Sequence, residues 1–326
     1  MKRPSLFPLT PVPFIASLLL LLLLPIALGH PNPLQPASPL VSIPPGTSFQ
    51  IQLSGDVDTS LPARVYELDL FDTPRETISY LKSRGSIVIC YFSAGSFEDW
   101  REDACAFPNH VKGKKLDDWP GECWLDVRDT NALGPIMRAR LLLAKSKGCD
   151  GVDPDNMDAF SNKASKTGFP ISSSDQLTYN RLIADTAHSL SLLVALKNCQ
   201  DLARDLLPWF DFLVTEECVQ YRECEQGTVF VRAGKANFNI EYKGSLQHIC
   251  RTTNALNIDA QKKHIDLDAR RELCKTYGDI GGGSGARGSA GAGASGPANG
   301  TDGAGAGGGR GIGDVIGKIL FGRQME

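Results

Sequence analysis

The sequence lacks the features that mark several large classes of protein. It has no excess of basic residues, since 34 lysines and arginines face 37 aspartates and glutamates and give a formal net charge of −3. Nucleic-acid binding usually requires a basic face, so this balance argues against a nucleic-acid partner. The chain has no Cys-x-x-Cys pair, and none of its five histidines lies at metal-ligand spacing from a cysteine or a glutamate. That argues against a structural zinc site, and we expect neither a metal nor another cofactor.

A clean membrane span of about 20 apolar residues is also missing. The run Phe14 to Leu24 is apolar, but prolines interrupt the segment at positions 8, 11, 13 and 25. Lys2 and Arg3 precede the run, and Ala27-Leu28-Gly29 offers small residues for cleavage. This pattern predicts a cleaved signal peptide over residues 1–29 and a secreted protein that can be associated with a cell wall, the alternative being an uncleaved anchor.

Composition divides the rest of the chain into three parts. Residues 30–46 are rich in proline and predict an extended spacer. Residues 279–326 form a tail dominated by Gly, Ala and Ser, which buries too little apolar surface to fold. It contains the sequon Asn299-Gly300-Thr301 and a short amphipathic pattern over 312–320. Residues 47–278 remain as one folded domain, which we expect to be monomeric and not stably inserted in a membrane.

Strand and helix patterns alternate through this domain. Helices are expected at 75–84, 133–147 and 174–191, and strands at 49–53, 65–69, 86–92, 123–127, 150–155, 192–198, 212–216 and 236–242. Such alternation favours a parallel sheet with right-handed crossovers. Eight strands in about 230 residues predict an α/β fold, the (β/α)₈ TIM barrel.

Most of the predicted strands end in polar side chains. In a barrel these ends converge at one rim, where enzymes of this fold carry out their chemistry. Strand ends are also polar simply because strands stop at the surface. The residues are Asp69, Asp72, Tyr91, Ser93, Asp126, Arg128, Asp153, Asp155, Asn156, Lys197, Asn198, Glu216, Glu217, Glu241 and Tyr242.

Two of these endings carry paired acids, Asp153 with Asp155 and Glu216 with Glu217. Glycosidic cleavage needs two carboxyl groups, one that donates a proton and one that stays ionised, so the acids predict a glycoside hydrolase. Trp100 and Trp124 lie near the loop after the third strand. Tryptophan packs on sugar faces and amines, although loop packing explains such residues equally well.

Nine cysteines suit a secreted protein. We expect disulfides between Cys105 and Cys123, between Cys218 and Cys224, and between Cys250 and Cys274. The other three lie in or beside apolar strands and are expected to be buried thiols; they are Cys90, Cys149 and Cys199.

Seven motifs, in order, resemble glycoside hydrolase family 114, the endo-α-1,4-polygalactosaminidases. They span nearly the whole core, at residues 66–73, 90–95, 100–101, 118–128, 148–156, 195–198 and 216–221, the last of which includes Tyr221. The resemblance implies a barrel-fold enzyme that cuts α-1,4-linked galactosamine polysaccharide by a retaining mechanism. It places the nucleophile on Asp155 and the acid/base on Glu216. Relatives are expected to have Asn-Glu-Gln-Cys where this chain has Thr215-Glu-Glu-Cys218.

Two other functions remain open at the level of sequence. The acids can merely grip amines in a carbohydrate-binding barrel without catalysis. Alternatively, the glycine-rich tail can be the working part of a wall-associated protein. An acidic rim would attract a cationic galactosamine polymer whether the barrel cleaves the polymer or only binds it. The same rim would repel uronic-acid polymers.

Overall fold

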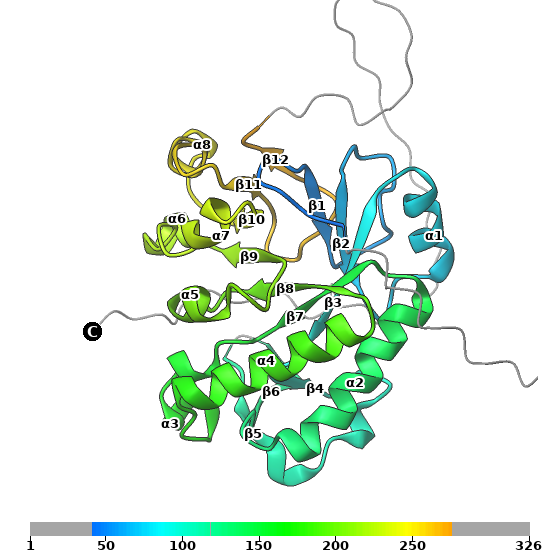
Figure 1. Cartoon of the computed structure of the whole chain (residues 1–326), viewed down its shortest axis with the longest axis vertical. Coiled ribbons are helices and arrows are strands. Elements are labelled where there is room, and N and C mark those ends of the chain that lie inside the picture. Colours follow the sequence, from blue (N-terminus) through cyan, green and yellow to red (C-terminus); the bar gives the residue numbers. More distant parts are fainter. Residues whose placement is uncertain (1–40, 118, 276–326) are drawn as a thin grey trace, which may run out of the picture. The chain divides into compact units, whose positions relative to one another are not determined.

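A computed structural model describes residues 41–117 and 119–275 (Figure 1). The predicted signal peptide, the glycine-rich tail, the sequon and the 312–320 pattern lie outside these residues. The end of the predicted spacer lies inside them and packs on the domain. The Ile43 side chain is 2% exposed, and its carbonyl accepts from the Ala236 amide at 2.8 Å. The folded part therefore includes residues from Ile43 onward.

The domain is a TIM-barrel-like α/β fold, as the sequence predicted. Its curled sheet has the order β1-β2-β3-β7-β8-β9-β10-β11-β12, in which only the last pair is antiparallel. The strands are β1 (Phe49–Gln52), β2 (Val65–Asp69), β3 (Ile87–Ser93), β7 (Gly151–Asp155), β8 (Leu193–Lys197), β9 (Phe212–Glu216), β10 (Asn237–Glu241), β11 (Asp259–Lys262) and β12 (Glu272–Leu273).

Side chains and one loop join β1 to the far end of the sheet. Gln261 Nε2 donates to the Phe49 carbonyl, and Lys263 Nζ donates to the Ile51 carbonyl at 2.6 Å. The Leu53 amide donates to the Leu267 carbonyl at 2.9 Å. These contacts satisfy edge groups of β1 that the strand ladder leaves unpaired.

Helices cover the outside of the sheet (Figure 1). Asp129 caps α2 by accepting from the Ala132 amide, and Ser172 and Asp175 form a capping box on α4. The helices are α1 (Arg75–Ser83), α2 (Thr130–Lys147), α3 (Ala164–Thr167), α4 (Ser173–Ser189), α5 (Ala203–Leu206), α6 (Cys218–Tyr221), α7 (Thr228–Arg232) and α8 (Leu246–Ala255). The 3₁₀ turns are η1 (Ala104–Ala106), η2 (Asn109–Val111), η3 (Ala159–Ser161) and η4 (Gln200–Leu202). Within the described ranges, no helix is both long and apolar enough to cross a bilayer.

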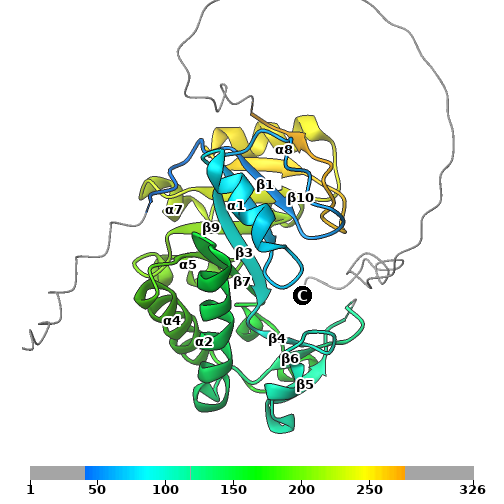
Figure 2. The same ribbon diagram turned by 90° about the vertical axis from the view of Figure 1, so that its right-hand side faces the viewer.

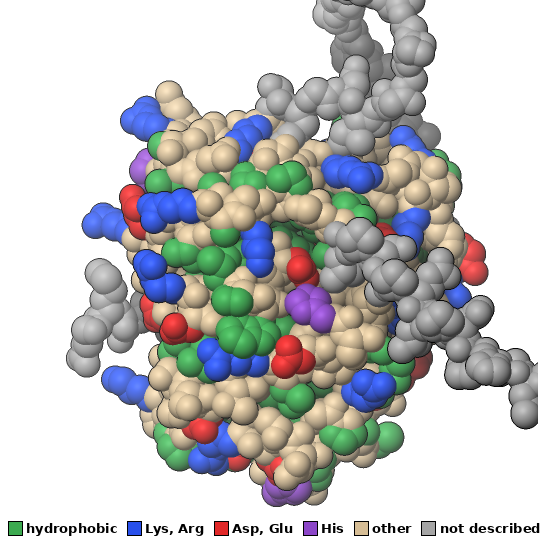
Figure 3. All heavy atoms as spheres, viewed as in Figure 1, with side chains coloured by type: hydrophobic (Ala, Val, Ile, Leu, Met, Phe, Trp, Pro, Cys, Tyr) green, Lys and Arg blue, Asp and Glu red, His purple; other side chains and the backbone are tan. Residues whose placement is uncertain are grey.

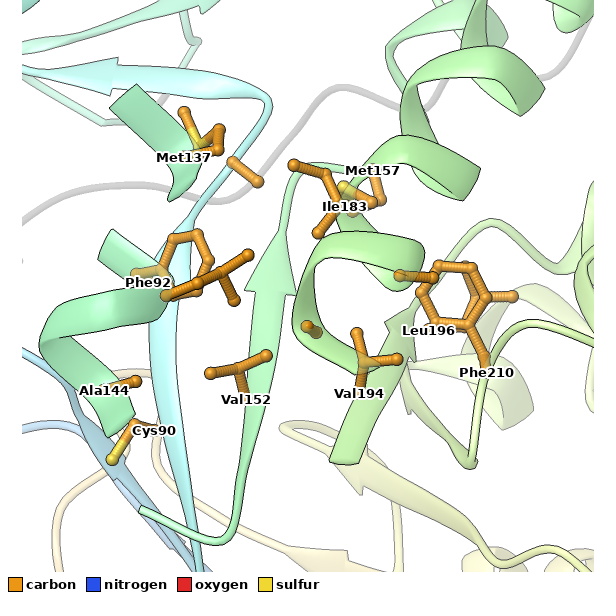
Figure 4. Close-up of a cluster of buried hydrophobic side chains, with 14 of the residues drawn as sticks. Cys90, Phe92, Met137, Ala144, Val152, Met157, Ile183, Val194, Leu196 and Phe210 are labelled. Atoms are coloured by element: carbon orange, nitrogen blue, oxygen red, sulfur yellow. The ribbon is translucent and has the colours of Figure 1, made fainter. Parts of the chain in front are cut away.

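Alternation along each strand divides the core into two layers. Phe92, Val152 and Val194 point outward and pack against side chains such as Met137 and Ile183 (Figure 4). The alternate residues fill the barrel interior, including Ile51, Ile89, Leu193, Val214 and Phe238. Because the period is two, the inward positions of β7 after Gly151 are Asp153 and Asp155. The same alternation directs Lys197 and Glu216 toward the barrel axis at the ends of β8 and β9.

The predicted strand at 123–127 is not a barrel strand, and this prediction was wrong. It forms β6 (Glu122–Leu125) in a separate antiparallel sheet with β4 (Ser96–Glu98) and β5 (Lys112–Lys115). Figure 2 shows this insertion sheet at the end of β3, beside α2 and far from α8. The eighth parallel strand is instead β11, which the sequence analysis missed. Asp259 and Gln261 lie on one face of the strand and are both 0% exposed, so this buried face lacks an apolar pattern.

Three disulfides cross-link the domain. Cys218–Cys224 and Cys250–Cys274 are confirmed. The predicted bridge between Cys105 and Cys123 was wrong, since both are free thiols. Cys90 and Cys149 are not buried thiols but form a bridge between β3 and the segment after α2, with a Cα–Cα distance of 6.1 Å. The buried thiol at Cys199 is confirmed.

Candidate active site

A buried lysine joins the two predicted catalytic carboxylates. Lys197 Nζ lies 3.2 Å from Asp155 Oδ1 and 3.2 Å from Glu216 Oε2. The lysine side chain is 2% exposed, whereas those of Asp155 and Glu216 are 18% and 24% exposed. Because both oxygens contact the same nitrogen, they can be no farther apart than twice that distance. The ends of β7, β8 and β9 thus bring together residues that are up to 61 positions apart.

Asp155 is held by three donors. Its Oδ1 accepts from the Asn156 amide at 2.7 Å as well as from Lys197, and its Oδ2 accepts from the Tyr91 hydroxyl at 2.7 Å. The Asp155 carbonyl accepts from the amides of Ala94 and Gly95 at 2.9 and 3.0 Å. Side chain and backbone are both fixed, and the acceptor role suits an ionised carboxylate.

Glu216 has a similar set of partners. Its Oε2 accepts from Asn198 Nδ2 at 3.1 Å, and its amide donates back to Asn198 Oδ1 at 2.9 Å. The Tyr242 hydroxyl donates to Oε1. Asn198 and Tyr242 therefore contact Glu216, and they orient its carboxylate rather than leave it free to rotate.

The surrounding groups titrate far from their usual ranges. Burial would lower the pKa of Lys197, but the carboxylates of Asp155 and Glu216 raise it well above its ordinary value. Burial, reinforced by the adjacent carboxylates, also raises the pKa of Tyr91 and of Tyr242 well above that of a free phenol. The lysine is therefore a fixed cation, and both hydroxyls keep their protons as donors.

A second acidic pair lies in the barrel interior near Lys197. Asp153 is 0% exposed and Glu67, on β2, is 2% exposed. Burial and then the charge of Asp153 raise the pKa of Glu67 well above its usual value, and burial raises that of Asp153 to about 6 against the opposing Lys197 charge. Ionisation of either carboxyl is therefore disfavoured while the other is charged. The sequence analysis missed Glu67, although it lies two residues before Asp69 on the same face of β2.

Ser93 also lies near the site, where it contacts Asn156, the residue whose amide donates to Asp155. Ser93 is 1% exposed, and its hydroxyl accepts from Asn156 Nδ2 at 3.0 Å. Glu217 adopts a left-handed conformation with φ of 55°, its amide donates to the Ile240 carbonyl at 2.7 Å, and its charge acts on Tyr242.

Two predicted acids have buried partners elsewhere. Asp69 forms a two-bond ion pair with Arg101, at 3.0 and 2.7 Å. Glu241 alternates away from Tyr242, and its Oε1 accepts from the Val219 amide at 2.8 Å and from Asn239 at 2.9 Å. Both sets of contacts stabilise loops around the rim, so a direct role for either acid in binding stays a prediction.

The remaining predicted residues lie on or near the surface of the insertion and adjacent loops. Asp126 and Arg128 pair with each other at 2.7 and 2.8 Å. Trp124 is partly buried against the core. The exposed side chains are Trp100 and Tyr221, at 42% and 40%, and Asp72, at 63%. Their proposed contacts with substrate remain predictions.

A cavity of about 240 Å³ opens among the loops that follow β7, β8 and β9. Three of its lining side chains are carboxylates and two are amides; the lining includes Asp158, Asp201, Glu223, Gln200, Gln226 and the buried Cys199. On the face shown in Figure 3, by contrast, acidic and basic side chains are interspersed rather than grouped by sign.

One group of side chains within the described ranges has the composition of a metal site. Ligand atoms of His264, Asp266 and Asp268 lie within 4.8 Å of one another. The imidazole is already engaged on both sides, by Asp268 at 2.9 Å and by the Arg270 guanidinium at 3.1 Å. A guanidinium at this position disfavours a second cation.

Comparisons with known proteins agree with the geometry. The model of glycoside-hydrolase family GH114 matches residues 30–278. The crystal structure of Aspergillus fumigatus Ega3 in complex with galactosamine is 36% identical, covers 72% of this chain and 97% of its own, and has a TM-score of 0.68. The glycoside hydrolase domain of PelA from Pseudomonas aeruginosa is 13% identical over 69% of this chain and 98% of its own, with a TM-score of 0.55, and shares the fold. A comparison with curated proteins found no match. The chain belongs to glycoside-hydrolase family GH114 and is a glycoside hydrolase.

Proposed function

We propose that the protein is a secreted endo-glycosidase that hydrolyses α-1,4-linked galactosamine polysaccharide, with Asp155 and Glu216 as its catalytic pair. The observation that carries this proposal is the convergence of both carboxylates on one buried ammonium, each at 3.2 Å from Lys197 Nζ. Two partly exposed acids in fixed positions at the rim of a barrel are what glycosidic cleavage requires.

The separation of the acids favours a retaining reaction. Retaining glycosidases place their carboxyl groups about 5–5.5 Å apart and inverting ones about 6.5–9.5 Å apart. The oxygens that face Lys197 can be no farther apart than twice 3.2 Å. This spacing leaves little room for a water between the nucleophile and the sugar.

The reaction then has two steps. Glu216 gives its proton to the glycosidic oxygen as the bond from that oxygen to the anomeric carbon breaks, and Asp155 forms an ester with that carbon. Glu216 next takes a proton from water, whose oxygen attacks the anomeric carbon and releases Asp155. The hydroxyl partner of Glu216, Tyr242, can donate to the carboxylate or accept from the acid, so Glu216 can change protonation without losing that bond.

Two observations support an amino-sugar polymer as the substrate. The relative Ega3, at 36% identity, has been crystallised with galactosamine. In this chain the cavity beside the catalytic strands is lined by Asp158, Asp201 and Glu223. Carboxylates attract the ammonium groups of deacetylated galactosamine and repel uronic acids.

The test is product analysis on partially deacetylated galactosamine polymer. We expect shorter oligomers by mass spectrometry from the wild type and none from Asp155→Asn or Glu216→Gln. Both variants preserve size, so circular dichroism should show an intact fold. An inactive wild type with full polymer retention would indicate a binding barrel instead, and unchanged activity in both variants would contradict the catalytic pair.

Leaving-group dependence tests the division of roles. An aryl galactosaminide with an acidic phenol needs little protonation to depart. Glu216→Ala should therefore cleave it in a first step, with azide restoring turnover, whereas Asp155→Ala should not. If Asp155→Ala is the rescued variant, the roles are reversed.

Secretion is part of the same proposal. We infer that residues 1–29 are removed as a signal peptide and that residues 30–42 and 279–326 flank a single catalytic domain. Three disulfides support an oxidising environment. Sequencing the N-terminus of protein recovered from culture medium tests this inference, and an intact Met1 would contradict cleavage.

A further inference from the structure

The residue after the proposed nucleophile has an unusual backbone conformation. Asn156 has φ of 60°, in the left-handed region that residues other than glycine adopt uncommonly. This conformation directs its amide to Asp155 Oδ1 at 2.7 Å. The backbone of Asn156 is therefore part of what fixes the Asp155 carboxylate, and something must hold Asn156 in turn.

The side chain of Asn156 is anchored in a buried chain of hydroxyls. Its Nδ2 donates to Ser93 Oγ at 3.0 Å and to Ser96 Oγ at 3.2 Å, and the two hydroxyls are 2.6 Å apart. Ser96 Oγ donates to Glu122 Oε2 at 2.6 Å. Ser93, Ser96 and Glu122 are 1%, 0% and 9% exposed, so water does not substitute for these bonds.

The number of hydroxyl protons fixes which group donates in each hydrogen bond between Asn156 and Glu122. Each serine has one hydroxyl proton. Because Ser96 gives its proton to Glu122, the short contact between the serines requires Ser93 to donate to Ser96. Ser93 then accepts from Asn156 Nδ2 and from the Ser96 amide, the latter at 3.1 Å. All these bonds form together only when an acceptor stands at the end, and Glu122 supplies it.

Close packing against Gly95 also restricts Asn156. A Cβ on Gly95 would lie 1.7 Å from the Asn156 carbonyl oxygen. The amide of Gly95 donates to the Asp155 carbonyl at 3.0 Å. Asn156 is thus held both by this backbone contact and by the hydroxyl chain.

We propose that Glu122 is a positioning residue for catalysis, which acts through Ser96, Ser93 and Asn156 to hold the Asp155 carboxylate. This inference rests on the proposed catalytic role of Asp155. It also gives a purpose to the insertion sheet, whose strand β6 carries Glu122 to the rim of the barrel. Burial raises the pKa of Glu122 to about 8 despite the Ser96 hydrogen bond. In either protonation state the carboxyl keeps an oxygen that can accept from Ser96.

Three variants separate this role from simple packing. Glu122→Leu removes the acceptor, Ser96→Ala breaks the same chain one step later, and Glu122→Gln keeps a carbonyl oxygen that Ser96 can donate to. We expect Glu122→Leu and Ser96→Ala to lower kcat at least about tenfold with KM within about twofold, because Asp155 is misplaced rather than substrate lost. Glu122→Gln should retain kcat within about threefold.

The double variant Ser96→Ala/Glu122→Leu completes a double-mutant cycle, which tests whether the two residues act together. Both substitutions interrupt one chain, so the double variant should be no slower than the worse single variant. Additive losses, a normal kcat in Glu122→Leu, or a Glu122→Gln as slow as Glu122→Leu would each overturn the proposal.

Amide hydrogen exchange gives a second readout that needs no substrate. Peptides covering Asn156 should exchange faster in Glu122→Leu but not in Glu122→Gln, while peptides from β10 and β11 stay at the wild-type rate. If Glu122→Leu does not fold, Ser96→Ala carries the same comparison. An inactive wild type would refute the proposed function alone, whereas unchanged exchange at Asn156 would refute the positioning role alone.

Discussion

Replacement of Lys197 by methionine tests the electrostatic logic of the site. Methionine has a similar length and no charge, so Lys197→Met leaves two carboxylates facing each other without their shared cation. In the wild type, Lys197 Nζ lies 3.2 Å from Asp155 Oδ1. Opposite unit charges about 4 Å apart attract each other by roughly 4 kcal/mol at an effective dielectric of about 20. Loss of that attraction corresponds to about three pH units.

The assay is the pH dependence of kcat/KM on galactosamine polymer. In Lys197→Met the acid limb, where Asp155 must ionise while Glu216 keeps its proton, should move up by about three pH units, since the Asp155 carboxylate has lost its cation. At a pH on the wild-type plateau near that limb, kcat/KM should fall by up to about 1000-fold. Unfolding should also be easier, because removing one partner of a buried ion pair typically costs about 3–5 kcal/mol.

Lys263 supplies a matched control. It is 1% exposed, and its Nζ donates to the carbonyls of Ile51 and Asp268 rather than to a carboxylate. Burial lowers its pKa to about 8. Lys263→Met should therefore weaken the contact between β1 and the segment after β11 and lower the free energy of unfolding, but leave the acid limb of the pH profile of kcat/KM unchanged. The reasoning is refuted if the acid limb of Lys197→Met lies within about half a pH unit of the wild type.

Two further predictions concern stability. The hydrogen bond from His188 to Asp211 raises the pKa of His188, so its stabilisation is complete below the unfolded pKa and is lost as pH rises through the folded one. The advantage of the wild type over His188→Gln in unfolding free energy should shrink between pH 5.5 and pH 9, and a constant advantage would contradict this. Removing the 59-residue Cys90–Cys149 link by double alanine substitution should cost about 2–5 kcal/mol in denaturant titrations. Peptide mapping without reduction should find that pair joined and Cys105 alkylated, and a Cys105–Cys123 peptide would show the opposite pairing.

The sequence was sufficient to predict several individual strands and helices of the fold. Period-two alternation and terminal acids predicted β7, β8 and β9, and cap residues predicted most of α2 and α4. The insertion misled the reading because Cys123 to Val127 has the same apolar pattern as a barrel strand. β11 was missed for the opposite reason, since its buried Gln261 satisfies a backbone carbonyl of β1 and has no apolar signature.

The sequence by itself placed paired acids at the ends of two strands, because strand period is a local and repetitive property, and the family resemblance pointed to Asp155 and Glu216 among them. Only the tertiary structure decided what surrounds them. The ammonium of Lys197 contacts both acids, and Glu67 comes from a strand that precedes Asp155 by more than 80 residues. Glu122 is linked to Asp155 through Ser96, Ser93 and Asn156. Contacts of this kind depend on side-chain distance in space, which no spacing along the chain records, and the same is true of the bridge between Cys90 and Cys149.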